Sequence, residues 1–227
     1  MSTPRTEVVV IGGGQAGLAM SYCLTAQGRF HVVLEQGRIA ESWRSKRWDS
    51  LRLIAPNWSL ELPAFTYPGD DPEGYMGKDE VAAHLETYAR SFAAPVQEGV
   101  RVTAIERTMS GEGFCVQTEA ESYTAAQVVI ATGALQRPRV PVWEAELPAS
   151  FTQVVPYDYR NPQLLPSGAV LVVGSGQTGC QIAEGPRSRG APGLSRDESQ
   201  LVVAAPLPRS GRLRLAPRTR LDAAHRR

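Results

Sequence analysis

The chain has 227 residues, of which 42% are hydrophobic and 21% are charged, and its formal net charge is +1. This is the composition of an ordinary globular protein that is long enough for one large domain or two small ones, and the net charge gives no reason to expect a nucleic-acid partner. No apolar run approaches the roughly 20 residues of a membrane span.

The N-terminus has no charged and then apolar build-up, so a secretory signal is not expected. The three cysteines, Cys23, Cys115 and Cys180, lie far apart and form no C-x-x-C pair. This spacing excludes dithiol redox centres, disulfide scaffolds and zinc ribbons, and it favours a reducing, cytoplasmic compartment. No group of His, Cys and carboxylate residues has the spacing of a metal site.

A phosphate-binding signal stands near the start of the chain. The apolar run 7–11 predicts a strand that is buried on both faces, and it leads directly into Gly12, Gly14 and Gly17. Gly12 allows a tight turn from strand to helix, Gly14 lets the backbone approach a pyrophosphate, and Gly17 permits close packing of the helix on the strand. An apolar helical segment follows, and Gly28 suits its C-terminus.

The same unit supplies the other contacts of a dinucleotide site. The free N–H groups around Gln15 and Ala16, with the helix dipole behind them, would hold the phosphate charge. A second apolar strand, 31–35, ends in Glu35, which can accept both hydroxyls of an adenosine ribose. Because this carboxylate disfavours a 2′-phosphate, the first site suits FAD or NAD rather than NADP.

A second copy of the signal begins at residue 170. The apolar run 170–173 leads into Gly174, Gly176 and Gly179, after which another helix starts. Ser175 is not the nucleophile of a G-x-S-x-G elbow, because position 173 would then have to be glycine. Two such motifs indicate two dinucleotides that face each other, and the usual pairing is a flavin that takes a hydride from a nicotinamide.

Between the two motifs, residues 79–92 predict an amphipathic helix. Asp79 suits its N-cap, the apolar stripe faces the core, and His84 beside the stripe is expected to be half-exposed. The segments 114–118 and 122–124 predict a hairpin that extends the sheet before the buried strand that starts at residue 127.

The layout resembles the flavoproteins with two dinucleotide-binding domains, and within them the flavin-containing monooxygenase group, which includes N-oxygenases and Baeyer–Villiger enzymes. It is most similar to a bacterial subgroup of flavin-dependent oxidoreductases. Besides the two glycine motifs and Glu35, the residues that carry the resemblance lie in the segments 41–44, 48–53, 131–133 and 159–162.

The resemblance implies further cofactor contacts. Trp43 and Arg44 would lie beside the FAD, with Arg44 offering donors to the pyrophosphate or to the isoalloxazine edge. Val102, in an expected strand 100–105, would lend its backbone to the adenine, and Thr132 and Gly133 would close over the FAD. On composition alone, the three tryptophans at 43, 48 and 58 could instead be core or lid aromatics.

Two departures from the family bear on oxygenation and leave cofactor binding intact. The monooxygenase signature places a histidine and a serine where this chain has Val155 and Pro156. A family asparagine that steadies the flavin corresponds to Ile54, and Asn57 lies too far along the chain to take its role.

A third departure is the segment 185–227. Gly185 and Pro186 predict that the second helix stops within about two turns. The segment then holds ten arginines, five prolines and three acidic residues, with no lysine and no Phe, Trp or Tyr, so its net charge is +7.

Three interpretations of this tail stay open. A basic arm for nucleic acid or membrane would use the charge, but the arginines form no helical face and no aromatic residues lie between them. A long insertion would leave 201–205 as the second strand of the second unit, eight residues later than in the first unit. The preferred hypothesis is a shifted reading frame, because GC-rich codons read out of frame give this composition.

The expected fold is therefore α/β: a three-layer, Rossmann-like FAD-binding domain (1–165, with the inserted hairpin), the opening β-turn-α of an NAD(P)-binding domain (166–184) and the basic tail (185–227). The expected function is an FAD-dependent oxidoreductase of monooxygenase type, in which NAD(P)H reduces the flavin for oxidation of a small organic substrate. The alternative is a fragment that binds FAD or a nucleotide without turnover. The sequence indicates no catalytic acid, base or nucleophile, and it leaves the substrate, the choice between NADPH and NADH, and the oligomeric state open.

Overall fold

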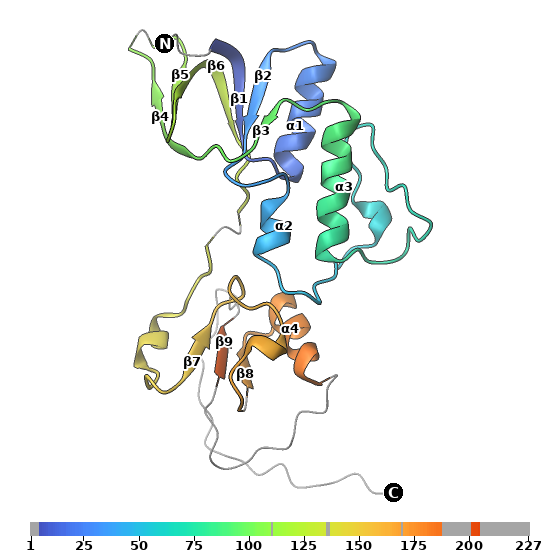
Figure 1. The fold of residues 1–227 in the computed structure, drawn as a ribbon, viewed down its shortest axis with the longest axis vertical. Helices are drawn as coiled ribbons and strands as arrows, with labels where there is room; N and C mark the ends of the chain where they lie inside the picture. Colours follow the sequence, from blue (N-terminus) through green and yellow to red (C-terminus); the bar gives the residue numbers. More distant parts are fainter. Residues whose placement is uncertain (1–4, 110, 135–136, 169, 188–200, 205–227) are drawn as a thin grey trace, which may run out of the picture.

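The computed structural model describes residues 5–109, 111–134, 137–168, 170–187 and 201–204. These residues form two units, each built on its own β-sheet, and the units lie one above the other in Figure 1. The upper unit holds a six-stranded sheet, and the lower unit holds a three-stranded sheet in which all strands are parallel.

The centre of the upper sheet is β1 (Arg5–Ile11), which pairs in parallel with β2 (His31–Leu34) on one edge and with β6 (Ser122–Ile130) on the other. The full strand order is β3-β2-β1-β6-β5-β4, with β3 at Val96–Gln97. This order brings the ends of β1 and β2 next to each other, with the end of β6 on the other side.

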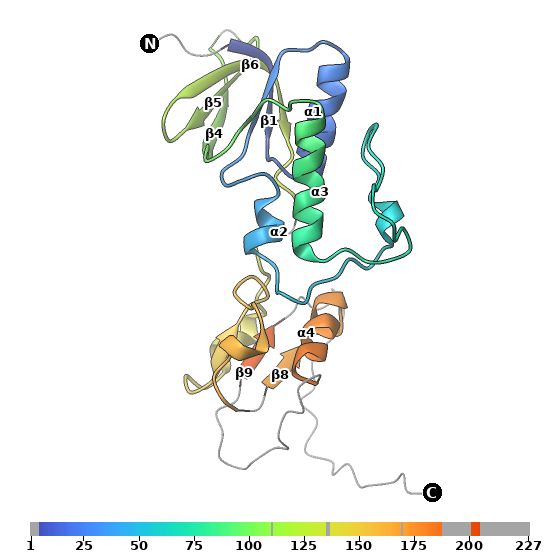
Figure 2. The same ribbon diagram turned by 45° about the vertical axis from the view of Figure 1, so that its right-hand side comes forward.

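Strand β1 is buried on both faces, as its unbroken apolar run predicts. Val8 and Val10 face one way and pack with Val33 and residues of the helical layer, while Val9 and Ile11 face the other way, toward Val116 and the antiparallel strands. Because side chains alternate along a strand, one β1 serves two separate cores. The fold therefore has three layers, as expected: helices, parallel sheet and antiparallel strands (Figure 2).

The predicted hairpin is present, and it is part of a longer strand. β5 (Phe114–Thr118) pairs antiparallel with the first residues of β6 and with β4 (Val102–Arg107). The strand that was expected to start separately at residue 127 is the second half of β6, which passes from the antiparallel layer into the parallel sheet without a break. The expectation that this part is buried is wrong, because Ile130 is 68% exposed and none of the residues 127–130 is fully buried.

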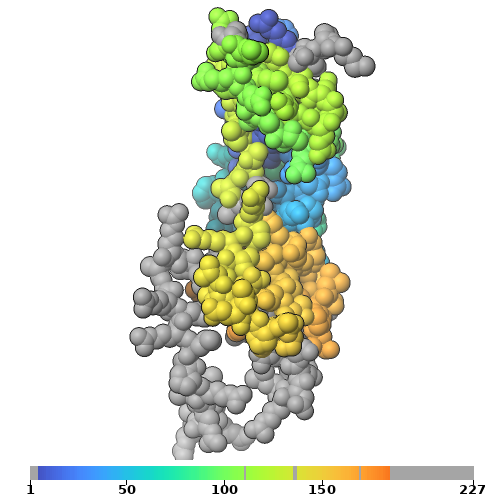
Figure 3. Space-filling model, turned by 90° about the vertical axis from the view of Figure 1, so that its left-hand side faces the viewer, coloured from blue at the N-terminus to red at the C-terminus, as the bar shows by residue number. Residues whose placement is uncertain are grey.

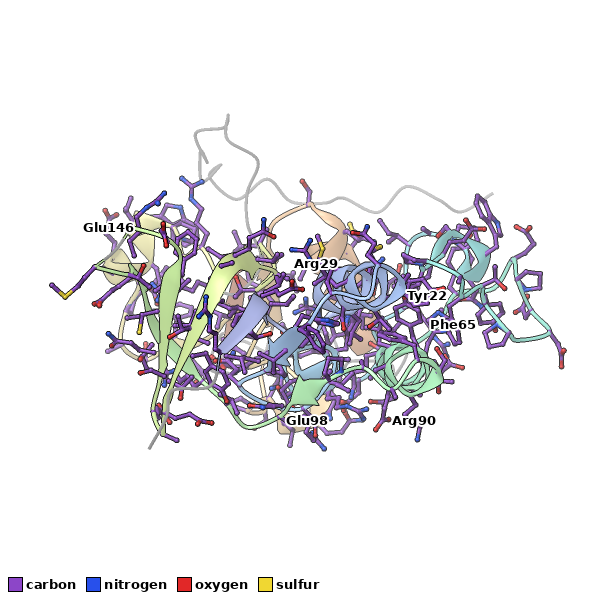
Figure 4. All side chains as sticks on the ribbon, turned by 90° about the horizontal axis from the view of Figure 1, so that it is seen from above. Tyr22, Arg29, Phe65, Arg90, Glu98 and Glu146 are labelled. Carbon is purple, nitrogen blue, oxygen red and sulfur yellow. The ribbon has the colours of Figure 1, made fainter. Side chains whose placement is uncertain are left out.

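Helices α1 (Gln15–Ala26) and α3 (Lys78–Ser91) cover one face of the parallel strands (Figure 1). The predicted stripe of α3 is confirmed: Val81, Leu85 and Tyr88 are fully buried. The rings of Tyr22 on α1 and Tyr88 stack at 6.0 Å between ring centroids, and Tyr22 and Phe65 lie on the same side of the helices in Figure 4.

The predicted N-cap of α3 is wrong by two residues. The cap is Gly77, whose backbone N–H donates to a carboxylate oxygen of Glu80 at 2.6 Å, so Asp79 lies inside the first turn. The side chain three positions after the cap decides where the helix begins, because it satisfies an N–H that the helix leaves free.

The prediction of a half-exposed His84 is also wrong, because only 6% of His84 is exposed. The aromatic rings of Phe65, at 5.0 Å from the imidazole, and of Tyr67, at 6.4 Å, cover this side of α3. The connection 36–77 thus folds back over the helix, a long-range contact that helical periodicity does not report.

This connection also contains elements that the sequence did not predict. They are the short helix α2 (Glu41–Ser45) and the 3-10 turn η1 (Asn57–Ser59). Asn57 is buried, and its side chain donates to the carbonyl of Asp71 at 2.9 Å and accepts from the N–H of Met76 at 2.6 Å. Its role is therefore to hold two parts of the connection together.

The lower unit begins at β7 (Thr152–Val154), continues with β8 (Val170–Val173) and α4 (Gln177–Arg187), and includes β9 (Leu201–Ala204). β9 lies between β7 and β8, so the strand required by the insertion interpretation of the tail is present. α4 runs through Gly185 and Pro186, which corrects the expectation that this pair stops the helix. The remaining tail residues, 188–200 and 205–227, lie outside the described residues.

The segment 45–52, here called the bridge segment, joins the two units (Figure 3, light blue above the second unit). The side chain of Gln181 on α4 accepts from the backbone N–H of Arg52 at 3.2 Å and donates to its carbonyl at 2.9 Å. Trp48 and Leu51 share an apolar cluster with Ile182 of α4 and Tyr159, so the bridge segment packs as part of the lower unit.

None of the helices in the described part of the chain is both long enough and apolar enough to cross a membrane.

The buried His84 predicts a pH dependence of stability. Burial lowers the pKa of His84 below its ordinary value, so the unfolded chain binds a proton at a higher pH than the folded chain does. The stability contributed by the neutral ring is present above that ordinary value and is lost as the pH falls below it. Urea unfolding at about pH 7.5 and about pH 5.5 should therefore show a smaller loss of stability in His84→Gln than in the wild type. An equal loss in both proteins would contradict this assignment.

Candidate dinucleotide-binding site

A cavity of about 980 Å³ lies where β1 and β2 end, beside the start of α1. Its walls come from the first glycine turn, from α2, from the start of β4 and from the turn that follows β6. The predicted site residues that line it are Gly12, Gly14, Gln15, Ala16, Glu35, Trp43, Val102, Thr132 and Gly133.

Two glycines of the turn are required by close packing. The backbone of Gly12 has a φ of +112°, and a Cβ on it would lie 2.5 Å from the carbonyl oxygen of Ala131. A Cβ on Gly17 would lie 1.8 Å from the carbonyl oxygen of Gly12. Gly17 is buried and does not line the cavity, so it brings α1 against the strand end, which is the packing role that the sequence predicts for it.

Gly14 differs from them because it faces open space. A Cβ on Gly14 would meet no protein atom within 4 Å, although Gly14 lines the cavity. Gly14 is also the N-cap of α1, where no side chain accepts a hydrogen bond from the helix and no acidic residue stands in the first turn. The start of α1 therefore presents uncapped N–H groups, including those of Gln15 and Ala16, to the cavity.

Glu35 is nearly buried, and its carboxylate is fixed from two sides. One oxygen accepts from the N–H of Gly13 at 2.7 Å, and the other accepts from the N–H of Gly37 at 2.8 Å. A Cβ on Gly13 would come within 3.0 Å of the Glu35 side chain, so a glycine there lets the acid reach the turn. A carboxylate has about four lone-pair sites, so acceptor capacity toward the cavity remains.

The opposite wall is formed by Val102, Thr132 and Gly133. β4 begins at Val102, two residues later than the expected strand, because Val100 instead donates its N–H to the carbonyl of Glu35 at 2.8 Å. The N–H of Ala131 donates to the carbonyl of Ile11 at 2.8 Å, which places the turn after β6 directly against the first glycine turn.

The structure separates Trp43 from Arg44. Trp43 lines the cavity, whereas Arg44 does not: its guanidinium donates to Glu86 at 3.1 Å and to the carbonyl of Ile39 at 3.3 Å. Of the other tryptophans, Trp48 is buried and Trp58 is exposed. The alternative interpretation, that these tryptophans are core aromatics, therefore holds for Trp48.

Further charged residues line the cavity that the sequence did not single out. The cations are Lys46, Arg47, Arg101 and Arg137, and the acids besides Glu35 are Glu41 and Glu61. Their positions in the sequence could have pointed to them, because most of these six charged residues lie within a few residues of a predicted cofactor contact.

The second glycine turn repeats the local geometry of the first. Gly174 has a φ of +121°, and α4 starts three residues after it, just as α1 starts three residues after Gly12. The N–H of Cys180 donates to the carbonyl of Gly176 at 3.0 Å, as the N–H of Leu18 does to Gly14 at 2.9 Å. Gly174, Gly176 and Gly179 lie in the lower unit and do not line the cavity.

Comparisons with known proteins agree with this geometry. An uncharacterized CzcO-like oxidoreductase of Geobacillus kaustophilus is 42% identical over 178 residues, which are 78% of this chain and 50% of that protein. The indole-3-pyruvate monooxygenase YUCCA1 of Oryza sativa subsp. japonica is 30% identical over 77% of this chain and 43% of its own length. The chain thus spans about half the length of the curated relatives it matches.

Among solved structures, a flavin monooxygenase variant from Stenotrophomonas maltophilia superposes with a TM-score of 0.73 at 26% identity. The superposition covers 89% of this chain and 58% of that one. The profile of one protein family also matches residues 9–191, which include both glycine turns. The chain accordingly belongs to the pyridine nucleotide-disulphide oxidoreductase family.

Proposed function

We propose that this chain carries the FAD-binding part of a flavin-dependent oxidoreductase of monooxygenase type. In this proposal NAD(P)H, held at the second glycine turn, reduces the flavin for the oxidation of a small organic substrate. The observation that carries the proposal is the uncapped start of α1, which opens through Gly14 onto the cavity beside Glu35.

The residues of the cavity fit the ADP half of FAD. The N–H groups at the start of α1 would hold the diphosphate, whose charge the helix dipole favours, and the side of Gly14 that lacks a Cβ leaves room for it. Glu35, fixed by two backbone donors, would accept the ribose hydroxyls, and Val102 would lie at the adenine. When bound, the flavin supplies the redox chemistry, and the protein binds and orients it.

The rest of the cavity suits the other half of the cofactor. Trp43, Thr132 and Gly133 line it, and their position between the glycine turn and the lower unit supports a flavin directed toward the second nucleotide. The residue that selects NADPH or NADH should follow β9, which places it outside the described residues.

Disulfide reduction, which the family name includes, is not part of the proposal. All three cysteines, Cys23, Cys115 and Cys180, are free, and no two of them have the spacing of a redox pair. The relatives that resemble this chain include a monooxygenase of indole-3-pyruvate, which supports oxidation of a small organic molecule.

A second candidate is a chain that binds FAD without turnover. It is favoured by Val155 and Pro156, which stand where the monooxygenase signature has a histidine and a serine, a change that leaves cofactor binding intact. Both candidates use the cavity at the first glycine turn, which lies within the described residues. They therefore differ in activity and not in FAD binding.

Alanine substitutions at Gly14 and Gly17 should have different effects: the first should weaken FAD binding, and the second should lower the stability of the fold. Gly14→Ala adds a Cβ in open space, so the free energy of unfolding should change by no more than about 1 kcal/mol. Its affinity for FAD should fall about tenfold or more, because the Cβ keeps the diphosphate from the N–H donors. Gly17→Ala should instead lose about 1–3 kcal/mol of stability, because its Cβ overlaps the Gly12 carbonyl. Urea unfolding and quenching of FAD fluorescence measure the two effects, and unchanged FAD affinity in Gly14→Ala would refute the site.

Glu35→Gln should weaken FAD binding about tenfold or more, because the amide replaces one charged acceptor with a donor that faces a backbone N–H. Glu98→Gln is the matched control, since Glu98 also accepts from a backbone N–H, that of Ile39 at 2.7 Å, and does not line the cavity. Calorimetric titration with FAD compares the two variants. Equal losses would show that Glu35 acts on the fold and not on the ligand.

The activity is tested on the purified chain through its visible spectrum and through the consumption of NADPH and NADH in air. The proposal expects a yellow protein, or one that turns yellow with added FAD, that consumes at least one of the two nucleotides. A yellow protein that consumes neither supports the second candidate. A chain that stays colourless with added FAD overturns both.

A further inference from the structure

Arg47 lines the cavity but has no role in the proposed FAD contacts. It lines the cavity, and no carboxylate of the described residues forms an ion pair with it. The neighbouring arginines differ: Arg44 pairs with Glu86, Arg52 with Glu80, and Arg160 donates to three backbone carbonyls. The guanidinium of Arg47 therefore lies beside the cavity with no carboxylate partner among the described residues.

Two aromatic rings hold the guanidinium of Arg47 in place. Its central carbon lies 5.5 Å from the ring centroid of Trp43 and 5.9 Å from that of Tyr157. Among the described residues, this group donates one hydrogen bond, from Nη1 to the carbonyl of Lys46 at 3.0 Å. Since a guanidinium has five N–H donors and stacking uses its faces, most of its edge stays free to donate.

The position of Arg47 separates it from the diphosphate site. Ala40, before α2, donates its N–H to the carbonyl of Gly13 in the glycine turn at 3.1 Å, whereas Arg47 follows the other end of α2. A helix of this length spans about 7 Å. Tyr157 belongs to the lower unit, so Arg47 lies between that unit and the cavity that it lines.

We propose that Arg47 binds an oxyanion of the second small molecule that enters this site, either a phosphate of the nicotinamide nucleotide or a carboxylate of the organic substrate. Both groups carry two oxygens on one central atom, and this pair can accept two parallel N–H bonds from a guanidinium. The proposal rests on the FAD site of the preceding section, and it assigns Arg47 to the ligand that meets the cofactor, not to FAD itself.

The test is a calorimetric titration of the full chain, with and without added FAD, using NADP⁺ in one arm and phenylpyruvate in the other. The variants are Arg47→Gln, Arg47→Lys and, as matched control, Arg52→Gln, which removes a nearby charge outside the cavity. The proposal expects that one ligand binds the wild type and loses about tenfold or more of its affinity in Arg47→Gln. Arg47→Lys should lose less, and Arg52→Gln should match the wild type.

The ligand whose affinity falls in Arg47→Gln, NADP⁺ or phenylpyruvate, identifies the source of the oxyanion. Tyr157→Leu should weaken the same ligand by a smaller factor, because it removes one stacking ring and no charge. FAD affinity should be the same in Arg47→Gln and the wild type, which also shows that the variant folds.

Three results would overturn the proposal: neither ligand binds the wild type, binding does not depend on Arg47, or Arg52→Gln loses as much affinity as Arg47→Gln. A wild type that binds neither FAD nor a nucleotide fails the proposed function instead, and the phenylpyruvate arm without FAD still reports on Arg47.

Discussion

The close approach of α1 to the end of β1 is the contact on which the candidate site depends. The carbonyl of Gly12 occupies the space that a Cβ on Gly17 would need, and the carbonyl of Ala131 occupies the space that a Cβ on Gly12 would need. These two contacts fix the first turn of α1 against two strand ends at once. The N–H groups of that turn consequently point into the cavity, where no side chain of the helix caps them.

The bridge segment places the two nucleotide turns in one molecule. It is held from above by α3, through the ion pairs Lys78–Asp49 and Arg52–Glu80, and from below by backbone contacts with Arg160 and Gln181. Trp48 is buried between these groups, and its indole N–H has no acceptor within the described residues. The segments 48–53 and 159–162, which carry part of the family resemblance, thus contribute to the contact between the units and do not line the cavity.

Local sequence was sufficient for the first β-α-β unit and for most of its site. The glycine spacing, the buried strand and Glu35 each follow from short-range rules, and the residues that those rules select line the cavity, apart from the packing glycine Gly17. The exposure of His84 and the direction of Arg44 depend instead on contacts with Phe65 and Glu86, far away in the sequence. Arg47 was missed because it follows α2 in the irregular bridge segment, where no helix or strand periodicity shows which side chains face the cavity.

Strand β6 belongs to two layers of the upper unit, because its first residues pair with β5 and its later residues pair with β1. Separating the antiparallel layer from the parallel sheet would require breaking one continuous strand, not just a packing interface. The hairpin therefore shares the cooperativity of the nucleotide-binding core, and the turn that lines the cavity after Ile130 is attached to a strand that is paired along both edges.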